Sequence, residues 1–475
     1  MFISTLPKMH RANKSFLLGA ALLVGCAHEA ALRPEDLKIT PAFSQAGVRA
    51  DADWWKSFNE PQLNGLIDRA MLANPDLAVA RARWREARAA LQAADAALLP
   101  RVDAQVSYNS QRTSAESGRN FPGMPRRFDT ATVGAQASWE LDLWGRNSAR
   151  SAAAAADALA AGFTAESVRV ALGAEVARLW FAVQSARRDV SCLTDEFQAR
   201  YREMEIIEQG VKAGLLSTDP LSTAQLAAAQ AKLDEGQAHR RLAGFENALC
   251  VVIGAQPGEM LPSSPSVENH RINPTFGAGV PSELLLHRPD LASSAARLDA
   301  AMSREGAARA DFYPSVTLTG QAGWQADPAS RLGRGSAGFW TLMPSVDLPL
   351  FDGQSREANL EAQRARIDLA GAEWRKAVLV AFREVEDALA DLRELNLQVD
   401  LALRVQKAAA DRLKNAQTRL QAGVADEREQ VIARRDAAQA LRTYSDLELE
   451  RCQVWVRLAA ATGGGWVRPA AEPAQ

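Results

Sequence analysis

Apolar residues change their spacing abruptly at Pro100. Before this proline they recur three or four residues apart, which is the seam of a helix packed on another helix. The seam positions are Leu77, Ala80, Trp84, Ala87, Leu91, Ala94 and Leu98. After Pro100, apolar residues alternate with polar ones from Val102 to Tyr108, which is the period of a strand with one apolar face. Because proline cannot continue a helix, the pattern predicts a long helix that leads directly into an amphipathic strand.

The pattern occurs twice along the chain. In the second copy a proline, Pro314, again starts an alternating strand, from Val316 to Trp324. Further landmarks recur at matching spacings, which indicates internal repetition. The matched pairs are Asn74-Pro75-Asp76-Leu77 with Arg288-Pro289-Asp290-Leu291, Pro100 with Pro314, Gly214 with Gly423, and Gly254 with Gly463. The sequence therefore predicts a tandem duplication.

Each copy contains a second alternating strand and therefore supplies a hairpin. In the first copy the return strand has apolar residues at every second position from Ala131 to Leu143. In the second copy the return strand contains Pro344 and closes with Pro349, which predicts a bend or bulge near its end. We expect the two hairpins at about 101–143 and 315–350.

Very long helices follow each hairpin. No proline or glycine occurs between Ala372 and Ala422, and a heptad seam runs from Val378 to Leu420 with Gln406 as its single polar position. The first copy has a corresponding arm from about Phe163 to Ala213. These lengths exceed the average globular helix several-fold, so they indicate coiled-coil packing.

The N-terminus has the features of a bacterial lipoprotein signal. Basic residues precede an apolar run from Phe16 to Val24, which is too short to span a bilayer as a helix. Leu23-Val24-Gly25-Cys26 resembles the lipobox, in which the cysteine becomes the lipidated first residue. Because Ala27 rather than aspartate follows, we expect transfer to the outer membrane. The alternative is an ordinary signal peptide with a chance cysteine.

Composition and charge argue against several other classes of protein. Lys and Arg number 55 against 57 Asp and Glu, so no nucleic-acid footprint is expected. Cys192, Cys250 and Cys452 lie in helical patterns without metal-ligand spacing and are expected to be buried apolar residues. Residues Gly333–Gly338 fit the GxGxxG motif but lie between two predicted strands, so we interpret them as a loop. We expect no enzyme activity, no metal site and no cofactor apart from a covalent lipid on Cys26.

The strands fit a membrane pore better than a soluble half-buried sheet, which is the commoner alternative. Strands of about ten residues can cross a bilayer when tilted, and here they occur as two isolated hairpins behind a lipoprotein signal. Open sheet edges in hydrocarbon leave backbone groups unpaired, so hairpins from several chains must complete one barrel. This argument leaves the number of chains open. The apolar face beginning at Val102 is expected to meet lipid, with Asp103 and Gln105 facing the lumen.

With these features the sequence resembles the TolC-like outer-membrane efflux protein family, in particular the lipoprotein members of RND-type tripartite efflux systems (the NodT-like branch). The resemblance covers about Ala50 to Gly463, nearly the whole mature chain. It rests on Trp54-Trp55-Lys56-x-Phe58, Asn74-Pro75-Asp76-Leu77, Trp139-x-Leu141-Asp142-Leu143-Trp144-Gly145, Arg288-Pro289-Asp290-Leu291 and Leu350-Phe351-Asp352-Gly353.

The resemblance implies a mainly α protein with membrane β-strands. Three chains would form a twelve-stranded outer-membrane β-barrel that continues into a twelve-helix periplasmic α-barrel, with an equatorial region at mid-height. Such a protein is the exit duct of a tripartite efflux pump and passively conducts small molecules, such as drugs or metal ions, to the outside. The implied partners are two further copies of the chain, a periplasmic adaptor, an inner-membrane pump and outer-membrane lipid.

The resemblance also places functional residues at the two helix-hairpin turns, where the family narrows its channel and meets adaptor and pump. The candidate gate residues, which would form acidic rings, are Asp426, Glu427, Glu429 and Asp219, and the candidate adaptor contacts are Gly214, Leu215, Gly423 and Val424. The alternative role for Asp219 and Asp426 is N-capping of the following helix. The run Glu427-Arg428-Glu429-Gln430 departs from the aromatic and leucine usual in the family.

These landmarks predict six segments. They are a signal peptide (1–25), a lipidated N-terminal and equatorial region (26–73), the first repeat (74–256), a Pro-rich equatorial linker (257–286), the second repeat (287–463) and a C-terminal tail (464–475). Two other functions fit the same elements. One is a TolC-like duct for type I protein secretion, and the other is a periplasmic coiled-coil lipoprotein that forms no pore.

Overall fold

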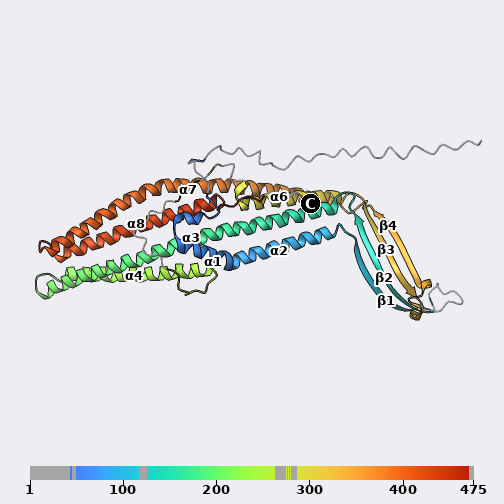
Figure 1. Cartoon of the computed structure of the whole chain (residues 1–475), viewed down its shortest axis with the longest axis horizontal. Coiled ribbons are helices and arrows are strands. Elements are labelled where there is room, and N and C mark those ends of the chain that lie inside the picture. Colours follow the sequence, from blue (N-terminus) through green and yellow to red (C-terminus); the bar gives the residue numbers. More distant parts are fainter. Residues whose placement is uncertain are drawn as a thin grey trace, which may run out of the picture. The chain divides into compact units, whose positions relative to one another are not determined.

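The computed structural model describes residues 43–44, 50–114, 116, 126–262, 274, 277, 279 and 286–469. This part of the chain is mainly helical and contains one four-stranded sheet (Figure 1). The elements before the second copy are η2 (Trp54–Phe58), α1 (Pro61–Ala73), α2 (Pro75–Ala96), β1 (Arg101–Arg112), β2 (Arg127–Leu141), α3 (Arg146–Lys212) and α4 (Asp219–Val252). Those of the second copy are α6 (Pro289–Ala310), β3 (Ser315–Ala326), η3 (Ala329–Arg331), η4 (Gly335–Ala337), β4 (Gly338–Asp347), α7 (Ser355–Gln421) and α8 (Glu427–Ala461).

The predicted change from helix to strand is confirmed in both copies. In the first, α2 ends at Ala96 and β1 begins directly after Pro100. In the second, α6 ends at Ala310 and β3 begins directly after Pro314. The order helix, strand, strand, long helix, long helix is therefore the same in each copy, as the duplication requires.

Two tryptophan side chains hold the backbone at these junctions. The indole N–H of Trp139 donates to the carbonyl oxygen of Leu98 (3.0 Å), and that of Trp144 donates to the carbonyl oxygen of Pro314 (2.7 Å). The ring of Trp144 also stacks on Tyr313, with ring centroids 5.0 Å apart. Each junction thus combines a satisfied backbone carbonyl with an exposed aromatic ring.

The helices α3 and α7 each contain 67 residues, a length of about 100 Å at 1.5 Å per residue. The seam predicted on α7 is confirmed, because every seam position from Val378 to Leu420 is buried or half-buried. The predicted start of the first arm near Phe163 is wrong, since α3 already begins at Arg146. A single glycine inside a helix costs only about 1 kcal/mol relative to alanine, so α3 continues through Gly162, where the indole of Trp84 lies in the space that a Cβ atom would need. In the described residues, no helix is both long enough and apolar enough to cross a membrane.

The four strands form one antiparallel sheet in the order β1-β2-β3-β4, so the two hairpins join along β2 and β3 (Figure 1). The bulge predicted near the end of the return strand is wrong: the register is uninterrupted from Ser315↔Asp347 to Trp324↔Gly338, with Pro344 opposite Leu318, and β4 ends at Asp347, before Pro349. β4 is an edge strand of this sheet, where proline's missing N–H can be accommodated.

The register places all alternating apolar residues on one side of the sheet, here called the apolar face. Its members are Val102, Ala104, Val106 and Tyr108 of β1, Ala131, Val133, Ala135, Ala137, Trp139 and Leu141 of β2, Val316, Leu318, Gly320, Ala322 and Trp324 of β3, and Gly338, Trp340, Leu342, Pro344 and Val346 of β4. The opposite polar face carries mainly amides and hydroxyls, including a hydrogen bond from Gln321 to Gln136 (3.0 Å). Asp103 and Gln105 lie on the polar face.

The two repeat motifs close each copy in the same way. Asn74 Nδ2 donates to the carbonyl oxygen of Val252 (2.8 Å), the last residue of α4. Arg288 Nη1 donates to the carbonyl oxygen of Ala461 (3.0 Å), the last residue of α8. Such terminal carbonyls have no partner within their helix. Each motif therefore fastens the start of its copy to the end of that copy's last helix.

A glycine follows each of these last helices at a point where two backbones touch. Gly254 and Gly463 have positive φ angles of 71° and 93°. A Cβ atom would lie 2.5 Å from the carbonyl oxygen of Ala73 at the first position, and 1.9 Å from that of His287 at the second. Only glycine fits both the backbone conformation and the space.

The three cysteines of the helical region are free and buried, as predicted. Burial raises the pKa of the Cys192 thiol to about 11, and burial also raises the pKa of Cys452. Cys250 and Cys452 belong to the main hydrophobic core, which joins Trp54, Trp55 and Trp180 with residues of α1, α3, α4 and α8. Because the thiolate is the reactive form, these thiols are packing residues.

Replacing Gly463 tests the backbone contact that closes the second copy. We expect Gly463→Ala to destabilise the protein by more than the roughly 1–2 kcal/mol that a left-handed conformation costs an alanine, because the new Cβ also collides with the carbonyl of His287. The control is Gly258→Ala, where φ is 91° but no atom lies within 4 Å of the added Cβ. The thermal midpoint of helix loss, followed by circular dichroism in detergent, should fall more for Gly463→Ala. Equal shifts would contradict the contact.

Candidate functional site

The candidate site is the end of the helical region that lies away from the sheet, where two hairpin turns come together (Figure 1). One turn joins α3 to α4, and the other joins α7 to α8. Since α3 also packs along α8, the two hairpins lie side by side. All sequence-predicted gate and adaptor residues belong to these two turns or to the first turn of the helix that follows.

Both turns stop the preceding helix with the same motif. Gly214 and Gly423 each have φ of 71°, the left-handed conformation that ends helices. The N–H of Leu215 donates to the carbonyl oxygen of Gly210 (2.9 Å), and that of Val424 donates to the carbonyl oxygen of Arg419 (3.0 Å). The motif leaves two apolar side chains in solvent, with Leu215 80% exposed and Val424 66% exposed.

The two aspartates of the turns differ in role. Asp426 is the N-cap of α8, and its Oδ1 accepts a hydrogen bond from the N–H of Glu429 (2.8 Å). Asp219 is already the first residue of α4, and the preceding Thr218 stands at the N-cap without a side-chain hydrogen bond. The capping alternative is therefore confirmed for Asp426 and wrong for Asp219, whose exposed carboxylate makes only the favourable interaction with the helix dipole.

The two glutamates of the α8 turn are paired with arginines. Glu427 accepts two hydrogen bonds from Arg202 of α3, at 2.7 and 3.0 Å. This pairing lowers the pKa of Glu427 below its ordinary value. Glu429 accepts a hydrogen bond from Arg419 of α7 at 2.5 Å. The first pair joins the two hairpins, whereas the second lies within one hairpin.

Further ion pairs continue along the contact between α3 and α8. Arg434 lies 2.7 Å from Asp195, and Arg442 lies 3.4 Å from Asp189. Sequence reasoning identified the glutamates of the tip but none of these arginine partners. Residues so far apart in the chain give no periodic signal that would pair them.

Three further predictions concern the lipidation site, metal binding and the GxGxxG loop. Cys26 lies outside the described residues. In the described residues, no group of three or more His, Cys, Asp or Glu side chains could hold a metal ion. The loop with the GxGxxG motif lies between β3 and β4, and no α-helix follows it before the strand.

Comparisons with known proteins agree on one family. A sequence model described as "Outer membrane efflux protein" matches residues 66–255 and 280–464. The toluene efflux pump outer membrane protein TtgF of Pseudomonas putida is 30% identical over 429 residues, 89% of this chain and 88% of TtgF. The cation efflux system protein CusC of Escherichia coli is 28% identical over 456 residues, 94% of this chain and 97% of CusC.

Solved structures give the same result. The open state of the outer membrane channel MtrE of Neisseria gonorrhoeae superposes with a TM-score of 0.76 at 28% identity, covering 90% of this chain and 95% of MtrE. A CusC structure superposes with a TM-score of 0.78 at 26% identity, covering 92% of this chain and 99% of CusC.

The different roles of the two aspartates can be measured. We expect Asp426→Ala to destabilise the first turn of α8 by about 1 kcal/mol, the usual cost of a lost N-cap. Asp219→Ala is the control, because its carboxylate makes no capping hydrogen bond. Amide hydrogen exchange should accelerate at residues 427–430 in the first variant, with a smaller change at 219–222 in the second. Similar acceleration in both turns would overturn this assignment.

Proposed function

The chain belongs to the outer membrane efflux protein family, and from this premise we propose that three copies form one continuous duct. The protein is an outer-membrane efflux channel that extends into the periplasm. We infer that it does no chemistry and that an inner-membrane pump, reached through a periplasmic adaptor, supplies the energy. The observation that carries the proposal is the sheet, which has one face that is apolar from Val102 to Tyr108 and across the facing strands, one polar face and two open edges.

The open edges support a ring of identical chains. β1 and β4 each pair on one side only, and unpaired backbone groups are not tolerated in hydrocarbon. Joining β4 of one copy to β1 of the next satisfies both edges, and repetition closes a barrel. The apolar face then meets lipid and the polar face lines the water-filled lumen.

The helices have matching open sides. α3 packs between α4 and α8, and α7 packs against α8 (Figure 1). The outer side of α7 exposes Leu397, Leu401 and Val405, and α4 exposes Leu226 and Leu233. These residues recur at helical spacing on faces without a partner in the described part of the protomer, which is the pattern of helix pairing. We propose that α7 of one copy packs on α4 of the next.

We propose that the tip acts as the gate through the Arg202–Glu427 pair. This pair fastens the α7–α8 hairpin to the α3–α4 hairpin, so the α7–α8 tip cannot move outward until the pair breaks. Asp426 and Glu429 stand in the same turn, and Asp219 stands in the other. In a ring of three copies these carboxylates recur three times around the opening, which favours cations there.

We propose that the exposed turns receive the adaptor. Gly214 and Gly423 give both turns the same backbone shape, and Leu215 and Val424 give both an exposed apolar side chain. A partner with small apolar pockets can therefore dock on either hairpin in the same way.

Substrate identity stays open in this proposal. Among the relatives, one bears the name of a toluene efflux pump and another that of a cation efflux system. Because the fold is shared by proteins with such different names, selectivity is expected to lie in the pump. A duct for type I protein secretion remains the second candidate, which the lipoprotein signal disfavours.

Single-channel recording in planar bilayers tests the duct and its gate together. Purified protein should conduct in discrete steps, and Arg202→Ala should raise the open probability severalfold because the ion pair between the hairpins that lies nearest the turns is lost. The control is Arg178→Ala, whose partner Glu175 belongs to the same helix (2.5 Å), and it should behave like the parent. No conductance from either the parent or Arg202→Ala would favour a lipoprotein that forms no pore.

The pH dependence of the gate has a definite sign. Because Arg202 lowers the pKa of Glu427, the pair contributes fully above the ordinary carboxyl pKa of 4.5 and is lost as the pH falls through the lower value of the folded protein. The open probability should therefore be constant near neutral pH and rise in acid. Glu427→Gln should remove this contribution.

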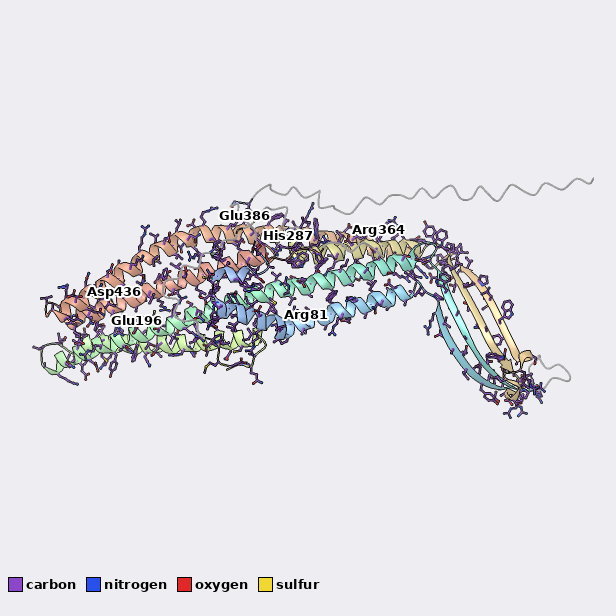
Figure 2. The ribbon with its side chains drawn as sticks, in the orientation of Figure 1. Arg81, Glu196, His287, Arg364, Glu386 and Asp436 are labelled. Carbon is purple, nitrogen blue, oxygen red and sulfur yellow. The ribbon has the colours of Figure 1, made fainter. Side chains whose placement is uncertain are left out.

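The contacts of Phe43 and Ser44 are compatible with a lipid anchor at Cys26. The ring of Phe43 packs on Phe382 of α7 (centroids 6.1 Å apart), and the N–H of Ser44 donates to Glu386 (3.0 Å; Glu386 is labelled in Figure 2). From Phe382 to the sheet end of α7 is about 40 Å along the helix. The residues from Cys26 to Phe43 can span up to about 60 Å when extended. An acyl chain on Cys26 can thus reach the inner surface of the outer membrane.

Acyl labelling tests this anchor directly. We expect the parent to incorporate labelled fatty acid in cells and Cys26→Ser to lose the label, since the thiol is the attachment atom. Cys192→Ser, at a buried thiol, is the control and should keep the label. Labelling that persists in Cys26→Ser would contradict lipidation at this residue.

A further inference from the structure

Arginine side chains gather at the loop end of the sheet. Arg112 is the last residue of β1 and lies directly opposite Arg127, the first residue of β2. Arg126 precedes Arg127 and is exposed. Like charges directly opposite each other in a sheet destabilise the pairing. Arg112, Arg126 and Arg127 are together called the rim. The repulsion between their charges weakens the strand pairing here, and an anion bound from outside the sheet would reduce this repulsion.

Arg112 and Arg127 lie on the same side as the apolar face. Arg112 follows Tyr108 and Ser110 at the two-residue period of β1, and Arg127 stands in the same series of β2 as Asp129 and Ala131. Side-chain contacts agree with this placement, because Arg127 reaches Asp129 (3.3 Å) and Ser110 (3.5 Å). The rim thus continues the apolar face just beyond its aromatic residues Tyr108, Trp324 and Trp340, which mark a membrane boundary.

The carboxylates at this end of the sheet, Asp129, Glu116 and Asp327, leave most of the rim without an ion-pair partner. Asp129 is 3.3 Å from Arg127 and already accepts a shorter hydrogen bond from Ser110 (2.6 Å). Within the described residues, neither Arg112 nor Arg126 has a carboxylate within ion-pair distance. Arginines without an ion-pair partner at one edge of a lipid-facing surface point to an anion supplied by the lipid.

The helix end of the sheet shows the opposite arrangement. Arg101 pairs with Asp103 (2.8 Å), and Arg146 pairs with Glu140 (2.5 Å). Just beyond β4, Arg356 pairs with Asp352 (2.7 Å). Arginines are therefore present at both ends, but the arginines named at the helix end are paired with carboxylates, whereas Arg112 and Arg126 at the loop end are not.

We propose that the rim binds the phosphate groups of a glycolipid in the outer leaflet of the membrane. The planar guanidinium group matches phosphate oxygens in pairs, and the apolar face directly below provides a surface for the acyl chains of the same lipid. The inference rests on the proposed duct, because the loop end faces outward only if the helices lie in the periplasm. A phosphate bound between Arg112 and Arg127 would also relieve the repulsion between them.

Lipid binding by the purified ring tests the proposal. The variant is Arg112→Gln/Arg127→Gln, and the control is Arg101→Gln on the same strand, at the other end and on the polar face. The probes are phosphatidylethanolamine vesicles with diphosphoryl lipid A, the same vesicles with dephosphorylated lipid A, and inorganic phosphate as competitor. Binding of detergent-solubilised protein is followed by tryptophan fluorescence in about 0.15 M salt, where the Debye length is about 8 Å.

We expect the double variant to bind the diphosphoryl vesicles roughly thirtyfold more weakly, because each of the two basic residues contributes about fivefold near an anionic lipid surface. Arg101→Gln should bind like the parent, and dephosphorylated lipid should not distinguish parent from double variant. Equal affinity of parent and double variant for the diphosphoryl vesicles would overturn the proposal. Displacement by inorganic phosphate at matched concentration would assign a free-phosphate site instead.

Two further measurements distinguish a lipid site from a role of the arginines in assembly. If the double variant no longer assembles, as judged by size-exclusion chromatography, the arginines serve the seam between chains and the proposal fails. Conductance of the parent tests the duct alone, so its absence would count against the proposed function. Intact assembly and conductance together with weakened binding to the phosphorylated lipid would support the rim as a lipid site.

Discussion

The unpaired backbone edges of β1 and β4 are the constraint on which the rest of this structure depends. Every N–H and C=O group that points outward from these strands lacks a partner within the described part of the protomer, and hydrocarbon offers none. Leaving such groups unpaired costs several kcal/mol each, far more than the side chains of one strand can supply. The sheet can enter a membrane only when the edge of one copy meets the complementary edge of another. Membrane insertion and ring formation are therefore coupled, because both require the same pairing of strand edges between copies.

The strand order then determines the helix order. β1 follows α2, β2 leads into α3, β3 follows α6 and β4 leads into α7 through short junctions. The helices pack in the corresponding order, with α3 between α2 and α6, and α7 against α6. A ring closed through the strands therefore also closes a ring of helices. Because of the duplication, each copy is closed by an equivalent contact. Asn74 donates a hydrogen bond to the carbonyl oxygen of Val252, and Arg288 donates one to the carbonyl oxygen of Ala461.

Much of this fold could be predicted from periodicity. The period change at Pro100, the seam of α7 and the alternating strands are local patterns, and local patterns report which face of an element is buried. Contacts between distant residues are different. Arg202 and Glu427 are 225 positions apart, and a single sequence contains nothing that pairs them. The interpretation of Pro344 is wrong because β3 and β4 keep an uninterrupted register through this proline, and the pairing of two strands cannot be read from the sequence of one of them. At the candidate site, the repeated glycines and the family resemblance located the turns and their acidic residues but could not distinguish the cap, Asp426, from the uncapped Asp219.

How firmly the gate is held shut depends on the solvent exposure of the Arg202–Glu427 ion pair and on its repetition in each copy of the ring. An ion pair as exposed as Arg202–Glu427 is weak by itself, because water and salt compete with it. In the proposed ring the same pair occurs in each of three copies, and the opening widens only if several tips move together. Weak pairs can then hold the tip shut collectively, while each remains easy to exchange for a contact with a docked partner. A buried ion pair would resist such exchange, since separating it leaves an uncompensated charge. Exposed pairs at the tip are therefore suited to a duct that opens through docking alone.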